Sequence, residues 1–165
     1  MTDNPLSEPK KRGSADRVRD FLASHGLAEE IVHFEQSTKT AQMAADAMSC
    51  ELGQIVKSLV FVVDATPVLA LVAGDRRGDS GAIASETGGE KAGFADADTV
   101  REATGYAIGG VSPFDLPTDL TVLIDDSLKR FDVVYPAAGT PSSMVRIPRD
   151  DLARMTGGRM ARISH

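Results

Sequence analysis

The sequence contains few of the residues on which several common protein chemistries depend. Of its 165 residues, one is cysteine, three are histidine and none is tryptophan. A single cysteine excludes an internal disulfide bond, and its apolar neighbours favour a small buried helix residue over a nucleophile. The three histidines are far apart, and neither a Gly-Lys-Ser/Thr phosphate loop nor a GxGxxG motif is present. We therefore expect no metal and no other cofactor.

Long apolar runs and excess positive charge are also missing. No run approaches the roughly 18 apolar residues of a membrane span, and the first residues, MTDNPLSEPKKRG, lack the apolar core of a signal peptide. These features predict a cytosolic protein that does not enter a membrane. The formal net charge of −6 argues against general binding to nucleic acid by overall attraction, although it leaves room for a local basic patch.

The composition is that of an ordinary globular domain, with 42% hydrophobic and 25% charged residues. Residues 1–13 are polar, contain two prolines and a Lys-Lys-Arg cluster, and read as a flexible tail. Residues 14–165 are long enough for one compact domain. We therefore predict one tail and one domain.

Apolar spacing and capping residues predict a mixture of helices and strands. Helices are expected from Ser14 to Gly26, from Thr40 to Gly53, twice within 79–105 and over 148–155; strands are expected at 31–34, 55–73 (a hairpin), 121–124, 132–135, 144–147 and near the C-terminus. The two types do not alternate regularly as βαβ units. An α+β fold around a curved mixed β-sheet, with surrounding helices, therefore fits best.

Two features suggest a binding pocket. Lys57 interrupts a strand that otherwise reads as buried, and lysine is rarely buried without a partner or a task. Gly109 and Gly110, followed by Val-Ser-Pro, predict a sharp turn that exposes amide groups and approaches another part of the molecule closely. Together they indicate a cationic, amide-lined pocket. The alternative for Lys57 is a place on the wetted face of an antiparallel sheet.

A serine-hydrolase interpretation has little support. Ser112 has no histidine near it in the sequence, and its Gly-Val-Ser-Pro context lacks the GxSxG spacing of a nucleophile elbow. Thr40 has a sufficient structural role as a helix N-cap, although a helix N-terminus that points into a site also attracts an anionic group.

An ordered set of segments resembles a known family. TAQMAADAM, GQIVKSLVF, PVLALVAGDRR, TGYAIGGVSPF, FDVVY and the AAGTP loop follow one another as in the YbaK/ProX-type aminoacyl-tRNA deacylases, free-standing relatives of the editing domain of prolyl-tRNA synthetase. The resemblance runs from about residue 14 to the C-terminus. It implies the fold of that editing domain and hydrolysis of the ester between a wrong amino acid and the 3′ end of a tRNA, often a tRNA for proline.

The resemblance also assigns residues. Lys57 matches the functional lysine of the family. Gly109, Gly110, Val111, Ser112 and Pro113 match its pocket turn, and Gly139 falls in a second small-residue loop beside the substrate. Asp75 is a weaker candidate, for orienting the α-ammonium group of the substrate. The implied partner is the acceptor end of a mischarged tRNA, and prolyl-tRNA synthetase is a candidate partner for delivery.

Several alternatives stay open at this point. An aminoacyl ester is reactive, so positioning and oxyanion stabilisation suffice, and water, a ribose hydroxyl or a substrate side chain could assist. Lys57 could bind a phosphate or ribose oxygen, or act as a base if burial lowers its pKa. A catalytically silent binding module and a hydrolase of small-molecule esters are the competing functions. Small wrong amino acids such as alanine or cysteine are the expected substrates, but sequence cannot choose among them.

Overall fold

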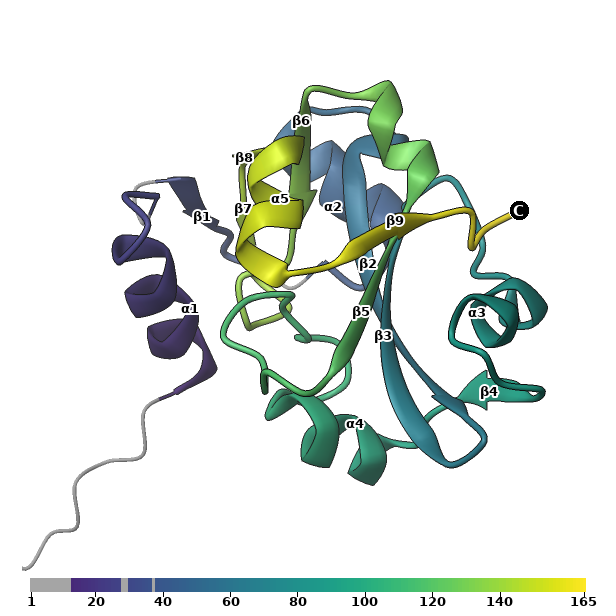
Figure 1. Cartoon of the computed structure of the whole chain (residues 1–165). Helices are drawn as coiled ribbons and strands as arrows, with labels where there is room; N and C mark the ends of the chain where they lie inside the picture. The colour runs from purple at the N-terminus through teal and green to yellow at the C-terminus, as the bar shows by residue number, and fades with distance from the viewer. Residues whose placement is uncertain (1–12, 28–29, 37) are drawn as a thin grey trace, which may run out of the picture.

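A curled, seven-stranded mixed sheet forms the centre of the molecule (Figure 1). The computed structural model describes residues 13–27, 30–36 and 38–165, so nearly all of the expected N-terminal tail lies outside the described residues. The strand order is β8-β6-β2-β3-β5-β9, and β4 also pairs with β2. The strands are β2 (Ile55–Val63), β3 (Thr66–Ala73), β4 (Ala92–Phe94), β5 (Thr121–Asp125), β6 (Val133–Pro136), β8 (Ile147–Pro148) and β9 (Arg159–Ala161). The expected α+β fold with a curved mixed sheet is confirmed.

The hairpin of β2 and β3 is the centre of this sheet, as predicted. The two strands pair antiparallel from Val56↔Ala73 to Val63↔Thr66, and the intervening Asp64 and Ala65 both have positive φ, as tight hairpin turns require. On its other side, β2 pairs with two short strands. Parallel β6 contacts it at Ile55–Val56, and antiparallel β4 contacts it at Phe61–Val63. The middle of β2 is therefore left with an open edge between β6 and β4.

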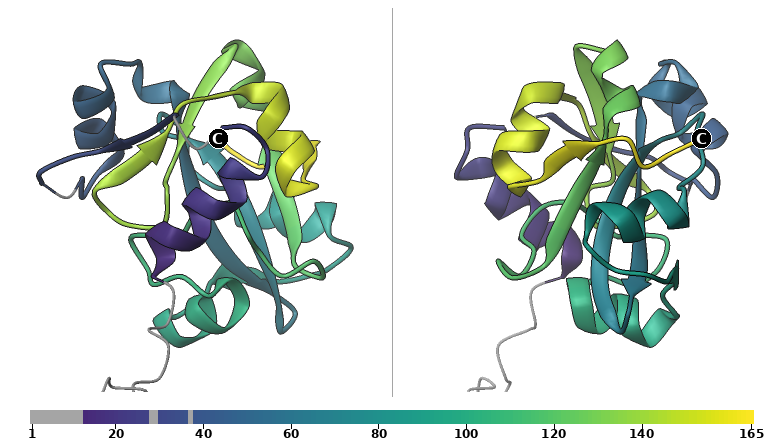
Figure 2. Two further views of the ribbon diagram at one scale, coloured as in Figure 1. Left: turned by 90° about the vertical axis from the view of Figure 1, so that its left-hand side faces the viewer. Right: turned by 45° about the vertical axis from the view of Figure 1, so that its right-hand side comes forward.

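Helices cover both faces of the sheet. α1 (Ser14–Ala23), α4 (Ala97–Thr104) and α5 (Arg149–Thr156) contribute buried residues to one core, whereas α3 (Ser80–Glu86) packs on the opposite face. Figures 1 and 2 show α1 and α3 on opposite sides of the molecule. α2 (Ala41–Met48) covers a third, smaller cluster around Ile55 and Tyr135. A separate pair of strands, β1 (Ile31–His33) and β7 (Ser143–Val145), lies beside the sheet.

Most expected elements are present, with differences at their ends. α1 begins at Ser14 as predicted, with Gly13 as its N-cap, and it ends at Ala23, three residues before the predicted end at Gly26. α2 begins after Thr40, as expected, but ends at Met48 because Ser49 adopts a left-handed conformation, and Gly53 belongs to a short 3-10 helix. The strand expected over 144–147 is divided into β7 and β8, which pair with different partners. A 3-10 helix, Asp126–Arg130, forms the helical turn that follows β5.

Candidate functional site

The open edge of β2 is one wall of a cavity of about 400 Å³. The other walls come from the segment that leads into α2, the end of β4, the turn of residues 109–113 that follows α4 (the glycine turn), and the loop between β6 and β7. The lining residues are Thr38–Ala41, Ala44, Ile55–Val60, Phe94, Ala95, Val100, Ile108, Gly109, Val111, Ala137, Thr140, Pro141, Ser143 and Met144. Six consecutive residues of one strand line the cavity, which indicates that β2 presents its edge as well as a face.

Two hydrogen bonds fix the direction of the main-chain groups along this edge. The amide of Gly74, which follows β3, donates to the carbonyl of Ile55 at 2.8 Å, and the amide of Ala95, which follows β4, donates to the carbonyl of Val60 at 3.0 Å. Along a strand, the N–H and C=O groups of successive residues point alternately to its two edges. The odd-numbered residues from Ile55 onward therefore bond to β3, whereas the N–H and C=O groups of Ser58 point to the other edge, into the gap between β6 and β4. Within the described residues, no hydrogen bond to either group is recorded.

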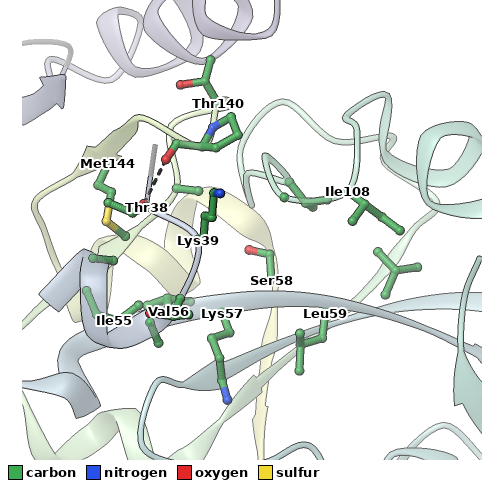
Figure 3. Close-up of a pocket in the computed structure, with 18 of the residues that line it drawn as sticks. Thr38, Lys39, Ile55, Val56, Lys57, Ser58, Leu59, Ile108, Thr140 and Met144 are labelled. Carbon is green, nitrogen blue, oxygen red and sulfur yellow. Dashed lines mark hydrogen bonds between the residues drawn. The ribbon is translucent and has the colours of Figure 1, made fainter. Parts of the chain in front are cut away.

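The side chain of Ser58 adds a third polar group, a hydroxyl, at the same place on the strand. Its Oγ is buried and has no hydrogen-bond partner among the described residues. In Figure 3 the hydroxyl lies on the opposite side of the strand from the Lys57 side chain, on the same side as Lys39 and Thr140. A buried, unpartnered hydroxyl is unusual because its desolvation is not compensated. Sequence reasoning missed Ser58, although a second polar residue in an otherwise apolar strand was a usable signal.

Lys57 is half-buried and lines the cavity, but its ammonium group is on the other side of β2 (Figure 3). There it donates a hydrogen bond to the carbonyl of Arg76, in the turn after β3. Burial, followed by the charge of Arg77, lowers the pKa of Lys57, and the carboxylates of Asp75 and Asp125 oppose this change. The cation that the cavity itself receives comes from Lys39, which is exposed and was not predicted.

The glycine turn contributes two of its predicted residues to the cavity lining. Gly109 and Val111 line it, and Gly109 has φ +92°, a conformation that favours glycine. The amide of Gly110 is used by the carbonyl of Ala107 at 3.0 Å, whereas no acceptor for the amides of Gly109 and Val111 is recorded in the described part of the chain. These two lining residues therefore have amides without an acceptor in the described part of the chain, and the amide-lined pocket stays a prediction.

Gly110 and Gly139 are not among the lining residues, and packing accounts for both glycines. A Cβ at Gly110 would lie 3.1 Å from the carbonyl oxygen of Gly139. Gly139 has φ +95°, and a Cβ there would lie 2.7 Å from the carbonyl oxygen of Ser14 in α1. The close approach predicted for the glycine turn is thus an approach to the second small-residue loop, which itself packs on α1.

The remaining predicted residues divide between the cavity and its surroundings. Thr40 lines the cavity, and its hydroxyl accepts from the amide of Met43 at 3.1 Å as the α2 N-cap. Ser112 is fully buried behind the turn, where its Oγ accepts from the amide of Phe114 at 3.3 Å, and Pro113 is buried beside it. Asp75 lies outside the lining, and Arg130 donates to both of its oxygens at 2.8 Å.

Two large apolar side chains stand at the cavity with much of their surface in solvent. Phe94 is 71% exposed and Ile108 is 58% exposed, and neither was predicted as part of the site. Phe94 also stacks on Phe61, with ring centroids 4.6 Å apart, so its ring is held in place by a buried neighbour. An exposed but fixed aromatic ring is a suitable surface for a nucleobase.

The lining, all of it described residues, contains no His, Cys, Asp or Glu. Its hydroxyl groups therefore have no adjacent protein base to make them nucleophiles. Cys50 is half-buried just after α2, outside the cavity, and burial together with Glu51 raises the pKa of its thiol. The described residues also hold no group of three potential metal ligands, and none of their helices combines the length and apolarity of a membrane span.

Comparison with known proteins places this geometry in context. Residues 35–155 match the family described as the aminoacyl-tRNA editing domain. Protein YwhH of Bacillus subtilis (strain 168) is 35% identical over 144 residues, with coverage of 87% of this chain and 91% of that protein. The multifunctional Ser/Thr-tRNA deacylase ProXp-y of Escherichia coli (strain K12) is 32% identical over 144 residues, with coverage of 84% and 86%. The crystal structure of a proposed trans-editing enzyme for prolyl tRNA synthetase superposes with a TM-score of 0.85 at 38% identity, covering 94% of this chain and 99% of that one.

Proposed function

The chain belongs to the aminoacyl-tRNA editing domain family, and we propose that it is a trans-editing hydrolase for mischarged tRNA that carries a small amino acid. The bond that it breaks is the ester between the amino acid and the terminal ribose. The observation that carries the proposal is the cavity, which combines free amides with the open edge of β2 and contains no protein acid or base. Such a site suits a reactive ester, which needs positioning and oxyanion stabilisation more than a protein nucleophile.

We assign the parts of the cavity as follows. The amides of Gly109 and Val111 stabilise the oxyanion that develops on the ester carbonyl. A water molecule attacks that carbonyl, the bond from the carbonyl carbon to the ribose oxygen breaks, and the vicinal ribose hydroxyl relays the proton of the water to the leaving ribose oxygen, so that the free amino acid and the uncharged tRNA are released. Phe94 and Ile108, at the exposed end, pack against the terminal base, because they are the large apolar side chains that the cavity presents to solvent. The volume of about 400 Å³ is in the range of small-ligand sites, which suits a nucleoside with a small acyl group.

We propose that Lys57 supplies a cation to the terminal nucleotide, as the resemblance implies. In this structure its ammonium group donates to the carbonyl of Arg76. Because the edge of β2 is open at this position, the long side chain can rotate around the edge and exchange that carbonyl for a phosphate or ribose oxygen. Lys39 is a second cation, on the cavity side of the strand.

The name of one relative supports a wider set of proposed substrates. ProXp-y is named as a deacylase of Ser/Thr-tRNA, so seryl and threonyl esters join the alanyl and cysteinyl esters expected from the sequence. We propose that the substrate tRNA is a tRNA for proline, since one structural relative is proposed to edit for prolyl tRNA synthetase, and that this synthetase delivers it in the cytoplasm. We further propose that the editing domain extends over residues 14–165, because Val18 and Leu22 of α1 are fully buried in the same core.

The test is deacylation of tRNA for proline charged in turn with serine, threonine, alanine, cysteine and 2-aminobutyrate. The wild-type chain is expected to hydrolyse at least one ester, and Lys57→Ala is expected to lower kcat/KM by about 100-fold, the usual cost of removing one electrostatic group from an active site. Lys129→Ala, a matched removal of an exposed lysine outside the cavity, should leave the rate unchanged. Binding of the aminoacylated end without hydrolysis of any ester would support the silent binding module instead.

A further inference from the structure

The geometry of the open strand edge points to Ser58 as the residue that reads the aminoacyl group. We propose that its main-chain carbonyl accepts a hydrogen bond from the α-ammonium group of the substrate, and that its hydroxyl bonds a hydroxyl on the substrate side chain. This inference rests on the proposed function and makes it more specific: the preferred esters are seryl and threonyl. The inference assigns selectivity between aminoacyl groups to Ser58, a polar residue in a cavity whose lining is otherwise largely apolar.

The first step of the argument is the pairing of β2. β6 pairs with β2 only at Ile55–Val56, and the pairing with β4, extended by the Ala95 amide, reaches no further than Val60. Between them Ser58 is the residue whose main-chain groups face the gap, as the alternation along the strand requires. A strand edge offers its N–H and C=O as a template for an extended ligand. An amino acid with an α-ammonium group and an ester carbonyl is such a ligand.

The second step is the side chain. Polar groups that are buried in native proteins almost always have a partner, and each exception needs an explanation. Ser58 Oγ is an exception at the wall of a cavity, whereas other lining hydroxyls have partners: Thr140 Oγ1 lies 2.7 Å from Ser143 Oγ, and Thr38 Oγ1 donates to the Pro141 carbonyl at 2.9 Å. Among the lining hydroxyls, the one that is buried without a partner in the described residues is therefore that of Ser58, on the cavity side of the strand (Figure 3).

The third step is the chemistry of discrimination. A site that hydrogen-bonds a substrate hydroxyl disfavours the analogue without it, because the buried group of the site is then left unpaired. An alanyl ester leaves Ser58 Oγ unpaired, whereas a seryl ester pairs it. Threonine and 2-aminobutyrate form a second pair that differs by one hydroxyl. Selectivity within each pair is thus the quantity that Ser58 controls.

The experiment compares kcat/KM for these two pairs of esters on tRNA for proline, with wild type, Ser58→Ala and Ser58→Thr. Wild type is expected to prefer the hydroxylated ester of each pair, and Ser58→Ala to lower that preference by roughly 3- to 10-fold, the value of one hydrogen bond. Ser58→Thr, which retains a hydroxyl, should keep most of the preference. Ser85→Ala, an exposed serine on α3, is the matched control and should change nothing.

Two further measurements separate this role from others. Because Ser58 Oγ has no partner to lose, Ser58→Ala should leave the midpoint of thermal unfolding unchanged or raise it; a fall of several degrees would assign the hydroxyl a structural role and overturn the inference. Equal losses for all four esters would also overturn it, while the proposed hydrolysis stood. Calorimetric binding of 3′-seryl- and 3′-alanylamino-3′-deoxyadenosine, which cannot be hydrolysed as esters, tests Ser58 even if no ester is cleaved. A serine preference that Ser58→Ala abolishes supports the inference, and equal binding overturns it.

Discussion

Lys57 and Ser58 show how one peptide unit separates two roles on a strand. Successive side chains point to opposite faces of a sheet, so these neighbours leave β2 on opposite sides. The Ser58 hydroxyl lies on the cavity side, whereas the Lys57 ammonium group bonds the carbonyl of Arg76 on the other. A lysine within an apolar strand is easily identified in a sequence as a candidate functional residue. Here, however, the group without a hydrogen-bond partner is the hydroxyl of the serine that follows it.

Tyr106 holds the glycine turn closed from the inside of the protein. It is fully buried, and its hydroxyl donates to the carbonyl of Phe114, which closes the loop that contains Gly109 and Val111. Burial raises the pKa of Tyr106 to about 12, while the nearby charge of Arg17 opposes this change. The loop is thus held by a neutral phenol that must keep its proton.

This phenol predicts a pH dependence of stability. Between about pH 10, where an unfolded tyrosine ionises, and about pH 12, the unfolded state loses a proton that the folded state retains, so the free energy of unfolding falls as pH rises. Tyr106→Phe lacks this contribution. Below pH 10, the free energy of unfolding of Tyr106→Phe should be lower than that of wild type by about 1 kcal/mol, the value of one hydrogen bond. Above pH 10 this deficit should decrease by up to about 1.4 kcal/mol per pH unit.

Denaturant unfolding of both proteins from pH 8 to pH 11.5 measures this difference. From pH 8 to pH 9 the tyrosine is protonated in both states, so the deficit should be constant there and serve as the internal control. A deficit that stays constant to pH 11.5 would show that the Tyr106 hydroxyl ionises as easily in the folded state as in the unfolded state.

At the scale of secondary structure elements, α1 acts as a clamp on the glycine turn. Arg17 of α1 donates to the carbonyl of Gly105 at 3.2 Å and to that of Asp115 at 2.6 Å, and its Nε donates to the Asp115 carboxylate at 3.0 Å. Its guanidinium carbon lies 4.5 Å from the centroid of the Tyr106 ring. One side chain therefore joins the two ends of the loop that bears Gly109 and Val111.

Replacement of Arg17 tests whether this clamp matters for catalysis. Arg17→Met keeps part of the apolar stem but removes the three hydrogen bonds, so amide hydrogen exchange should become faster across 105–115. The kcat/KM should fall by about 10-fold for every ester, because small displacements of catalytic groups are costly. Selectivity between seryl and alanyl esters should not change, since β2 is untouched.

Arg19→Met, on the same helix, is the matched control. Arg19 is 58% exposed and pairs with Asp16 within α1, so its removal should affect neither exchange nor rate. If Arg17→Met exchanged as slowly as Arg19→Met over 105–115, the loop would be held by Tyr106 and its own packing alone.

The elements also show what a sequence can and cannot predict. The hairpin of β2 and β3 follows from local patterns and was predicted almost to the residue, and the start of α2 at Thr40 was predicted correctly, although its end was placed five residues too late. The gap at Ser58 could not be predicted, because it depends on where β4 and β6 stop pairing with β2, which is decided by tertiary packing. The face of the sheet on which the Lys57 side chain lies could not be predicted for a related reason. Both faces of β2 are covered by other elements, so the β2 sequence does not alternate between polar and apolar residues in a way that identifies a solvent-exposed face.

For the whole molecule, the acidic balance limits how tRNA can bind. The net charge is −6, and six arginines of the described residues are in ion pairs with carboxylates of the same chain: Arg17, Arg19, Arg130, Arg149, Arg154 and Arg159. Surface pairs of this kind contribute little to stability, but they reduce the positive charge that is available to phosphates. At the cavity, the lysines available to a nucleic acid are Lys39 and Lys57. This distribution favours contact with the single-stranded acceptor end over contact with the body of the tRNA.

The dependence of activity on salt tests this conclusion. Two phosphate contacts to a single strand give a slope of log kcat/KM against log salt concentration of about −1.4, or roughly a sevenfold loss between 50 and 200 mM salt at subsaturating substrate. A minihelix that retains only the acceptor stem should be hydrolysed at nearly the full rate. Lys39→Ala should reduce the magnitude of the slope by about 0.7, whereas Lys129→Ala should leave it unchanged. A slope near −6, or a minihelix that is not hydrolysed, would mean that the enzyme binds the tRNA body through a surface other than this cavity, and that the arginines now paired with carboxylates exchange partners when tRNA binds.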